Sequence, residues 1–190
     1  MREYKKDSHE EEKKAMRSTT DMYQSKFFSH RRADTEVFAK ECATSCRGGS
    51  VLALQGELGS GKTTFVQAFA KTLGVRRRIT SPTFVLMRMY RVNGQMSHVK
   101  CFVHVDAYRV RKAEELVAIG LLDVLGRRDT VTIIEWADRV RTIIPTHATW
   151  IRFDYGSTPS ERMIIIRRRG KFRRRRSGHQ ALSKVHLVPS

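Results

Sequence analysis

The glycine-rich octapeptide at residues 56–63, G-E-L-G-S-G-K-T, sets the strongest limit on the fold of this chain. It fits the P-loop pattern, in which Gly56 and Gly61 are separated by four residues and followed by Lys62 and Thr63. Glycine lets the backbone take positive φ and bring its N–H groups against phosphate oxygens. Lysine can reach the β- and γ-phosphates, and the threonine hydroxyl can ligate magnesium. The octapeptide therefore predicts a site for nucleotide phosphates.

The flanking residues predict the context that a P-loop needs. Residues 51–55 are apolar except for the last and predict a buried strand, and residues 64–71 predict a helix. The N-terminus of such a helix points its partial positive charge at the phosphates. The alternative, a plain glycine turn between a strand and a helix, requires a chance match to the whole pattern.

The remaining elements predict an α/β domain around this unit. A helix is expected over residues 34–42, with Asp34 or a neighbour as its cap. Its expected apolar stripe consists of Val37, Phe38, Cys42 and Cys46. Further along the chain, we expect a strand over 83–90, a turn at 92–94, a strand over 99–105, a helix over 114–125 interrupted at Gly120, a strand over 130–136, and a closing hairpin of 150–155 and 162–166. This order predicts a P-loop NTPase-like mixed sheet with flanking helices and antiparallel edge hairpins.

Charge divides the 190 residues, whose formal net charge is +18, into three parts. Residues 1–26 are polar and charge-mixed and predict a flexible N-terminal extension, whereas residues 27–166 predict the folded domain. Residues 167–190 contain nine Lys or Arg and no acid, which predicts an Arg-rich disordered tail. A basic excess favours an anionic partner such as nucleic acid, although such a tail can also serve only solubility.

The sequence favours a cytoplasmic protein without a membrane partner. The N-terminus lacks the apolar run of a signal peptide, and no run approaches the length of a membrane span. The three cysteines, Cys42, Cys46 and Cys101, do not complete a zinc pattern and are typical of buried thiols in a reducing compartment.

Two carboxylates stand where a phosphate-transferring site needs them. Asp106 and Glu135 each close an apolar strand, so both are expected at the ligand-binding edge of the sheet. From position alone either could hold magnesium while the other orients a water, and either could instead cap the next helix.

Two further elements are candidates for the site. Ser81 and Thr83 lie between the P-loop helix and the next strand, where a γ-phosphate-sensing segment falls in P-loop enzymes, although an ordinary Ser-Pro turn is the alternative. We call residues 81–83 the switch segment. Trp136, next to Glu135, can shape the site or belong to the core.

Four motifs in order closely resemble the TsaE family, also called YjeE: the P-loop, then S-P-T-F at 81–84, H-V-D-A-Y-R at 104–109 and I-E-W at 134–136. The resemblance covers residues 27–166. It implies a small bacterial ATPase that works with the TsaB and TsaD proteins and binds ATP and Mg²⁺. Together these proteins place the threonylcarbamoyl group on the adenosine next to the anticodon of ANN-decoding tRNAs. The family's member does not transfer that group itself, and its hydrolysis resets the complex.

The resemblance also implies roles for single residues. Thr63 and Glu135 are the expected magnesium ligands, and Lys62 and Asp106 join Glu135 as catalytic residues. The expected nucleotide-binding residues are Thr35, Gly59, Ser60, Gly61, Lys62, Thr63, Thr64, Ser81, Thr83 and Trp136. His104 and Tyr108 match the family motif without an assigned role, and Arg109 is expected to be structural or partner-facing rather than an arginine finger.

Two other functions remain as alternatives. A P-loop small-molecule kinase usually needs an Arg-rich lid, and the run at residues 76–78 resembles one but lies on the wrong side of the switch segment. A basic nucleic-acid-binding protein would use the tail, which could also add tRNA affinity to an ATPase.

Overall fold

Four parallel strands form the centre of the fold and carry the P-loop at one end. The computed structural model describes residues 22–93, 99–169 and 185–186. Its sheet has the order β3-β4-β5-β2-β6-β7-β1-β8. The parallel strands are β4 (Cys101–Asp106), β5 (Thr130–Glu135), β2 (Val51–Gly56) and β6 (Thr149–Tyr155). All six residues of β5 are buried, as expected where helices cover both faces of a parallel sheet.

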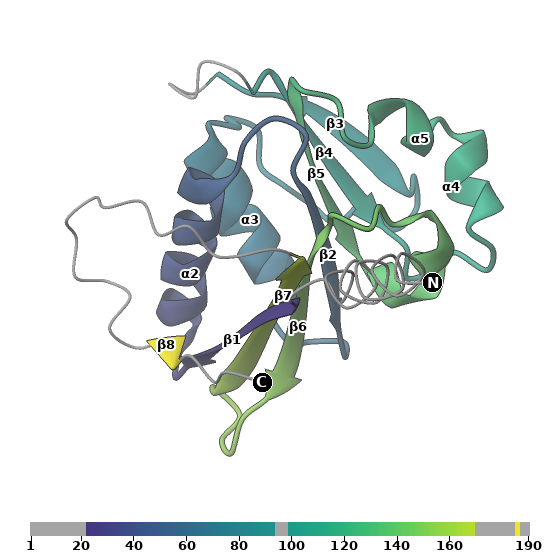
Figure 1. The fold of residues 1–190 in the computed structure, drawn as a ribbon. Helices are drawn as coiled ribbons and strands as arrows, with labels where there is room; N and C mark the ends of the chain where they lie inside the picture. The colour runs from purple at the N-terminus through teal and green to yellow at the C-terminus, as the bar shows by residue number, and fades with distance from the viewer. Residues whose placement is uncertain (1–21, 94–98, 170–184, 187–190) are drawn as a thin grey trace, which may run out of the picture.

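Antiparallel strands extend the sheet on both sides of this centre (Figure 1). β3 (Met87–Arg91) pairs with β4 at one edge. On the other side, β7 (Arg162–Arg169) pairs with β6, β1 (Met22–Ser29) with β7, and β8 (Val185–His186) with β1. This mixed sheet confirms the predicted fold class, including the antiparallel hairpins.

Helices cover the two faces of the sheet separately (Figure 1). α2 (Arg32–Ser45) and α3 (Lys62–Leu73) pack on one face, whereas α4 (Glu114–Ala118), α5 (Leu121–Val124) and the 3₁₀ helix η1 (Ala137–Ile143) pack on the other. The alternation of β2 explains how one strand serves both layers, because successive strand side chains point to opposite faces. Leu52 and Leu54 join the first layer, and Val51 and Ala53 join the second.

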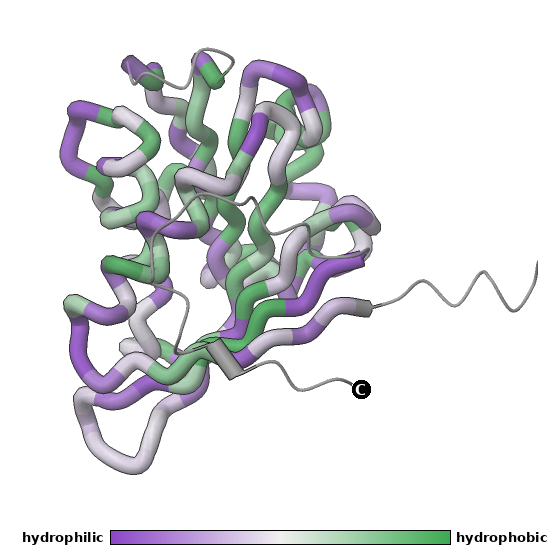
Figure 2. Tube along the Cα trace, turned by 60° about the vertical axis from the view of Figure 1, so that its left-hand side comes forward, coloured by the Kyte–Doolittle hydropathy of each residue, from purple (hydrophilic) through white to green (hydrophobic). Residues whose placement is uncertain are grey.

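A chain of aromatic rings ties the first helix layer to the sheet. Phe27 of β1 stacks on Phe38 of α2 with ring centroids 5.0 Å apart, and Phe38 lies 5.6 Å from Phe65 of α3. Phe65 meets Phe153 of β6 edge-on at 5.6 Å. Figure 2 shows hydrophobic segments in the centre of the sheet, and hydrophilic ones in the surrounding loops and along parts of the outer strands.

Two of the observed strands extend across the predicted domain boundaries. The boundary at residue 27 falls inside β1, which begins at Met22 and pairs with β7 along its whole length. The boundary at residue 166 falls inside β7, which continues to Arg169, and a two-residue strand occurs at Val185–His186 within the expected tail. The basic residues at 167–169 therefore belong to the sheet because backbone pairing, rather than apolar side chains, extends the strand. The rest of the expected extension and tail lies outside the described residues.

The first helix also differs from the prediction. α2 begins at Arg32, and Asp34 lies within its first turn, where its carboxylate accepts the backbone N–H groups of His30 and Arg31 at 3.0 and 3.3 Å. Val37 does not belong to the buried stripe, since 51% of its surface is exposed. The buried positions of the helix are Thr35, Phe38, Ala39 and Ala43.

The other predicted elements are close to those observed. Gly120, at φ 82°, separates α4 from α5, as expected. β3 is shorter than predicted and begins only at Met87, and Gly94 of the predicted turn lies outside the described residues.

Burial raises the pKa of the free Cys46 thiol to about 12. Within the described part of the chain, no helix has the length and apolarity needed to cross a membrane.

Candidate nucleotide-binding site

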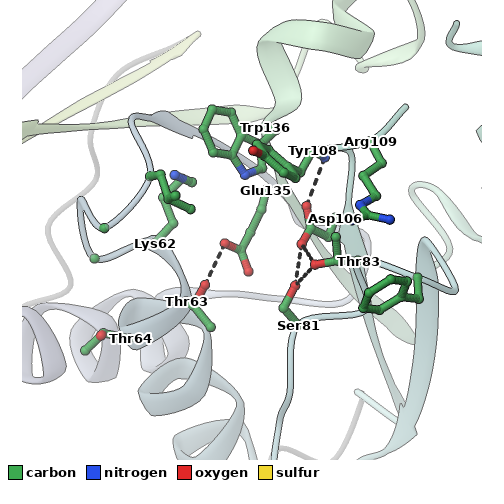
Figure 3. Close-up of a pocket in the computed structure, with 14 residues that line it drawn as sticks. Lys62, Thr63, Thr64, Ser81, Thr83, Asp106, Tyr108, Arg109, Glu135 and Trp136 are labelled. Atoms are coloured by element: carbon green, nitrogen blue, oxygen red, sulfur yellow. Dashed lines mark hydrogen bonds between the residues drawn. The ribbon is translucent and has the colours of Figure 1, made fainter. Parts of the chain in front are cut away.

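A cavity of about 480 Å³ lies at the carboxyl ends of β2, β4 and β5, against the N-terminus of α3 (Figure 3). Ligands bind at this edge of open α/β sheets. The lining residues come from all four predicted motifs: Leu58, Gly59, Gly61, Lys62, Thr63, Thr64, Ser81, Thr83, Phe84, Asp106, Tyr108, Arg109, Glu135 and Trp136.

The glycines of the P-loop are required by its geometry. Gly61 has φ 104° immediately before the first residue of α3, in the left-handed region that favours glycine. A Cβ on Gly56 would lie 2.4 Å from the carbonyl oxygen of Phe153, so β2 could not approach β6 this closely with any other residue. The loop therefore turns directly into the helix and leaves the first N–H groups of α3 free of helical partners.

Lys62 lies over this loop with its ammonium held in place. Its Nζ donates to the carbonyl oxygens of Gly56 and Glu57 at 2.7 and 2.8 Å and lies 4.0 Å from the ring centroid of Trp136. Burial lowers the pKa of Lys62, and the carboxylates of Glu135 and Asp106 oppose that shift. Two of the three ammonium hydrogens are used by these carbonyls, which leaves one for a phosphate oxygen.

Thr63 and Glu135 meet across the cavity. The Thr63 hydroxyl donates to Glu135 Oε2 at 3.0 Å, although the two residues are 72 positions apart in the chain. The other carboxylate oxygen, Oε1, lies 2.8 Å from Nε2 of His104, which is completely buried. Each Glu135 oxygen thus has one partner, and the side chain is held from both sides.

Asp106 connects the switch segment to the site (Figure 3). Its Oδ2 accepts hydrogen bonds from the hydroxyls of Ser81 and Thr83, the latter at 2.7 Å. Its Oδ1 accepts the backbone N–H of Tyr108 at 2.9 Å. Movement of residues 81–83 would therefore release one oxygen of this carboxylate.

Two residues have a strained backbone, and one of them, Trp136, lines the cavity. Leu86 (φ 59°) and Trp136 (φ 58°) are the non-glycine residues with positive φ in the described part of the chain. Leu86 follows the switch segment and Trp136 follows Glu135, and such backbone strain concentrates at functional sites. The Trp136 ring lies 5.1 Å from that of Tyr108, so Trp136 forms a wall of the cavity rather than part of a sealed core.

The structure does not bring every predicted residue to the cavity. Thr35 is buried and bonds to the Ser29 hydroxyl at 2.8 Å, and neither Thr35 nor Ser60 lines the cavity. The arginine run at 76–78 is also absent from the lining of the cavity. The sequence left His104 without a role, and only its place in the motif beside Asp106 pointed to the site.

The residues present fit magnesium. A threonine hydroxyl and a carboxylate are hard oxygen ligands, and Mg²⁺ is usually held by one or two protein groups together with water and substrate phosphates. In the described residues, no group of three or more His, Cys, Asp or Glu side chains could hold a metal ion. The pair formed by Thr63 and Glu135 is thus better suited to Mg²⁺ than to a metal that needs a full protein cage.

Comparisons with known proteins give the family. The model of the family described as "Threonylcarbamoyl adenosine biosynthesis protein TsaE" matches residues 29–164. The tRNA threonylcarbamoyladenosine biosynthesis proteins TsaE of Bacillus subtilis and Treponema pallidum are 35% and 38% identical to this chain over 112 and 103 residues. These alignments cover 59% and 54% of this chain. They cover 66% and 71% of the relatives, so the chain spans about two thirds of their length.

A solved structure agrees with the sequence match. The crystal structure of Bacillus subtilis YdiB is similar to this fold with a TM-score of 0.64 at 28% sequence identity. The match covers 78% of this chain and 88% of the YdiB chain. The family match extends from the end of β1 into β7 and includes every motif that lines the cavity. The chain therefore belongs to the TsaE family of threonylcarbamoyl adenosine biosynthesis proteins.

Proposed function

We propose that this chain is the ATPase subunit of the system that installs the threonylcarbamoyl group on the adenosine next to the anticodon of ANN-decoding tRNAs. It works with TsaB and TsaD and does not transfer the group itself. Its relatives carry the name of this pathway, which supports the assignment. ATP hydrolysis resets the complex between turnovers.

One observation carries the proposal: the Thr63 hydroxyl and the Glu135 carboxylate lie 3.0 Å apart beside the P-loop lysine. A hydroxyl from the first turn of α3 and an acid at the end of a buried strand are the two protein groups that hold magnesium in P-loop NTPases. Thr63 and Glu135 would hold the ion in this chain. Magnesium supplies positive charge that offsets the charge of the phosphates.

The other residues of the cavity suit hydrolysis. Lys62 and the free N–H groups at the start of α3 would bind the phosphates and stabilise the charge that develops on them. Asp106 would orient the attacking water and accept its proton, because it is the second carboxylate of the cavity. Ser81 and Thr83 bond to that same carboxylate, so a γ-phosphate that attracts their hydroxyls would change how Asp106 is held.

The test is reconstitution of tRNA threonylcarbamoylation with purified TsaB and TsaD. The wild-type chain is expected to hydrolyse ATP weakly alone and faster with the two partners. Lys62→Ala should reduce both hydrolysis and modification by orders of magnitude, because it removes a phosphate contact made in the transition state. Lys40→Ala, at an exposed position of α2, is the matched control. Full ATP binding and full tRNA modification by Lys62→Ala would refute the assignment.

A further inference from the structure

One long part of the chain carries only positive charge. The 48 residues from Leu58 to Val105 contain eight Lys or Arg and no Asp or Glu. Lys62 accounts for one of these charges and belongs to the cavity. Five of the others are arginines that the proposed ATPase does not use.

These five arginines lie on the loop after α3 and on the edge strand β3. Arg76, Arg77 and Arg78 occupy the irregular segment between α3 and the switch segment, and Arg88 and Arg91 belong to β3. All five are exposed, and none lines the nucleotide cavity. We call this set the arginine edge.

The loop of the arginine edge has a fixed backbone. Val75 and Ile79, on either side of the three arginines, are buried in the core with 7% and 4% of their surface exposed. The Ile79 carbonyl accepts the side-chain amide of Gln67 at 3.1 Å, and the Gly74 carbonyl accepts the Asn93 N–H at 3.1 Å. Both ends of the loop are therefore tied to α3 or to the end of β3, so the backbone carrying its guanidinium groups is ordered in advance.

Two contacts join the loop to the strand. Besides the bond from Asn93, Arg88 reaches from β3 to the Thr80 hydroxyl at 2.9 Å. Among the described strands, β3 is the last on its side of the sheet, and none of them covers its outer edge (Figure 1). The loop and β3 thus form one continuous edge that a large partner can reach.

Among the residues that the structure describes, the arginines of this edge have no acidic partner in an ion pair. Other arginines form ion pairs, such as Arg32 with Glu36 at 2.8 Å and Arg152 with Asp154 at 2.7 Å. Within the described ranges, no ion pair includes a member of the arginine edge. Guanidinium groups carry the charge opposite to that of phosphate oxygens, and their planar geometry allows two parallel hydrogen bonds to a phosphate.

We propose that the arginine edge binds the phosphate backbone of a folded RNA. A cluster of arginines that form no ion pair within the described ranges, on a preordered loop beside an exposed strand, complements a polyanion. The choice of RNA rests on the proposed function, whose pathway modifies tRNA. The surface is separate from the nucleotide cavity, so its loss leaves ATP hydrolysis by the chain alone unchanged.

The test measures the affinity of the full chain for a tRNA transcript by fluorescence anisotropy between 0.05 and 0.3 M salt. The variant Arg76→Gln, Arg77→Gln, Arg78→Gln removes three charges from the arginine edge. Each lost phosphate contact lowers the slope of log K against log salt by about 0.7–0.9, so the slope should fall by about 2–3. Affinity at 0.1 M salt should fall at least about tenfold.

The matched control, Lys40→Gln, Arg111→Gln, Lys112→Gln, removes the same charge from exposed positions elsewhere and keeps the same C-terminal residues. Its slope should fall by less than about one. An unchanged slope in the edge variant, or an equal fall in the control, would overturn the proposal. ATP hydrolysis is measured on the same samples. If the wild-type chain does not hydrolyse ATP, the proposed ATPase function is wrong. If the wild-type chain does not bind the tRNA transcript, the proposal for the arginine edge is wrong.

Discussion

Asp106→Asn separates nucleotide binding from hydrolysis. The substitution keeps the shape of the side chain, and the amide oxygen can still accept the Tyr108 N–H, which the carboxylate accepts at 2.9 Å. The amide nitrogen can donate to the Ser81 and Thr83 hydroxyls, which can rotate to accept. The fold of the switch segment should therefore survive, while the negative charge that would orient and deprotonate a water is lost.

The size of the effect follows from the role proposed for Asp106. A positioned general base contributes about 10²–10⁴ in rate, which corresponds to about 2.7–5.4 kcal/mol of transition-state stabilisation. Single-turnover hydrolysis should slow by that factor, while the affinity for an ATP analogue should change less than about threefold. Asp138→Asn is the control. The Asp138 carboxylate, like that of Asp106, favours the charged form of Lys62 and so opposes the lowering of its pKa, but Asp138 is exposed and does not line the cavity. Wild-type hydrolysis by Asp106→Asn, or equal slowing in Asp138→Asn, would show the reasoning to be wrong.

Two other substitutions test parts of the structure that the sequence did not assign. His104→Leu removes the 2.8 Å partner of Glu135, so magnesium should bind the chain–ATP complex about 10–100-fold more weakly. His104→Gln keeps a donor and should restore part of that affinity. If the two variants give identical magnesium titrations, this positioning role is excluded. Phe27→Ala should lower the free energy of unfolding by about 3–5 kcal/mol, because Phe27 stacks on Phe38 in the core. Phe28 lies on the opposite, half-exposed face of β1, so Phe28→Ala should lower it by less than about 1 kcal/mol. If the two variants shift thermal unfolding equally, β1 is not part of the core.

The cavity could be predicted largely from the sequence because its residues lie in short motifs at strand ends. A glycine-rich loop between an apolar strand and a helix places Lys62 and Thr63 almost without reference to the rest of the chain. Asp106 and Glu135 close neighbouring parallel strands, and they are direct partners in the register of β4 and β5. Parallel pairing therefore brings them to the same edge, as their positions implied.

The parts that the prediction missed depend on distant contacts. The face of β1 that packs toward the core contains Ser25 and Ser29, so the alternation that marks a half-buried strand is weak there. Its pairing partner lies more than a hundred residues away in β7, which no local pattern indicates. Thr35 was expected near the nucleotide but is buried against Ser29, a contact that exists only because β1 is in the sheet. His104 has no distinguishing local pattern either, because its role depends on a bond across two strands.

Calorimetry of a non-hydrolysable ATP analogue, with and without Mg²⁺, examines the proposed phosphate and metal site itself. Wild-type protein should bind the analogue more tightly when Mg²⁺ is present, and Glu135→Gln should lose most of that gain, because the substitution removes the charge of one of the two magnesium ligands. Binding without Mg²⁺ should remain similar in the two proteins. An equal gain from Mg²⁺ in wild type and Glu135→Gln, or no binding by either protein, would contradict the assignment of this cavity to Mg-ATP.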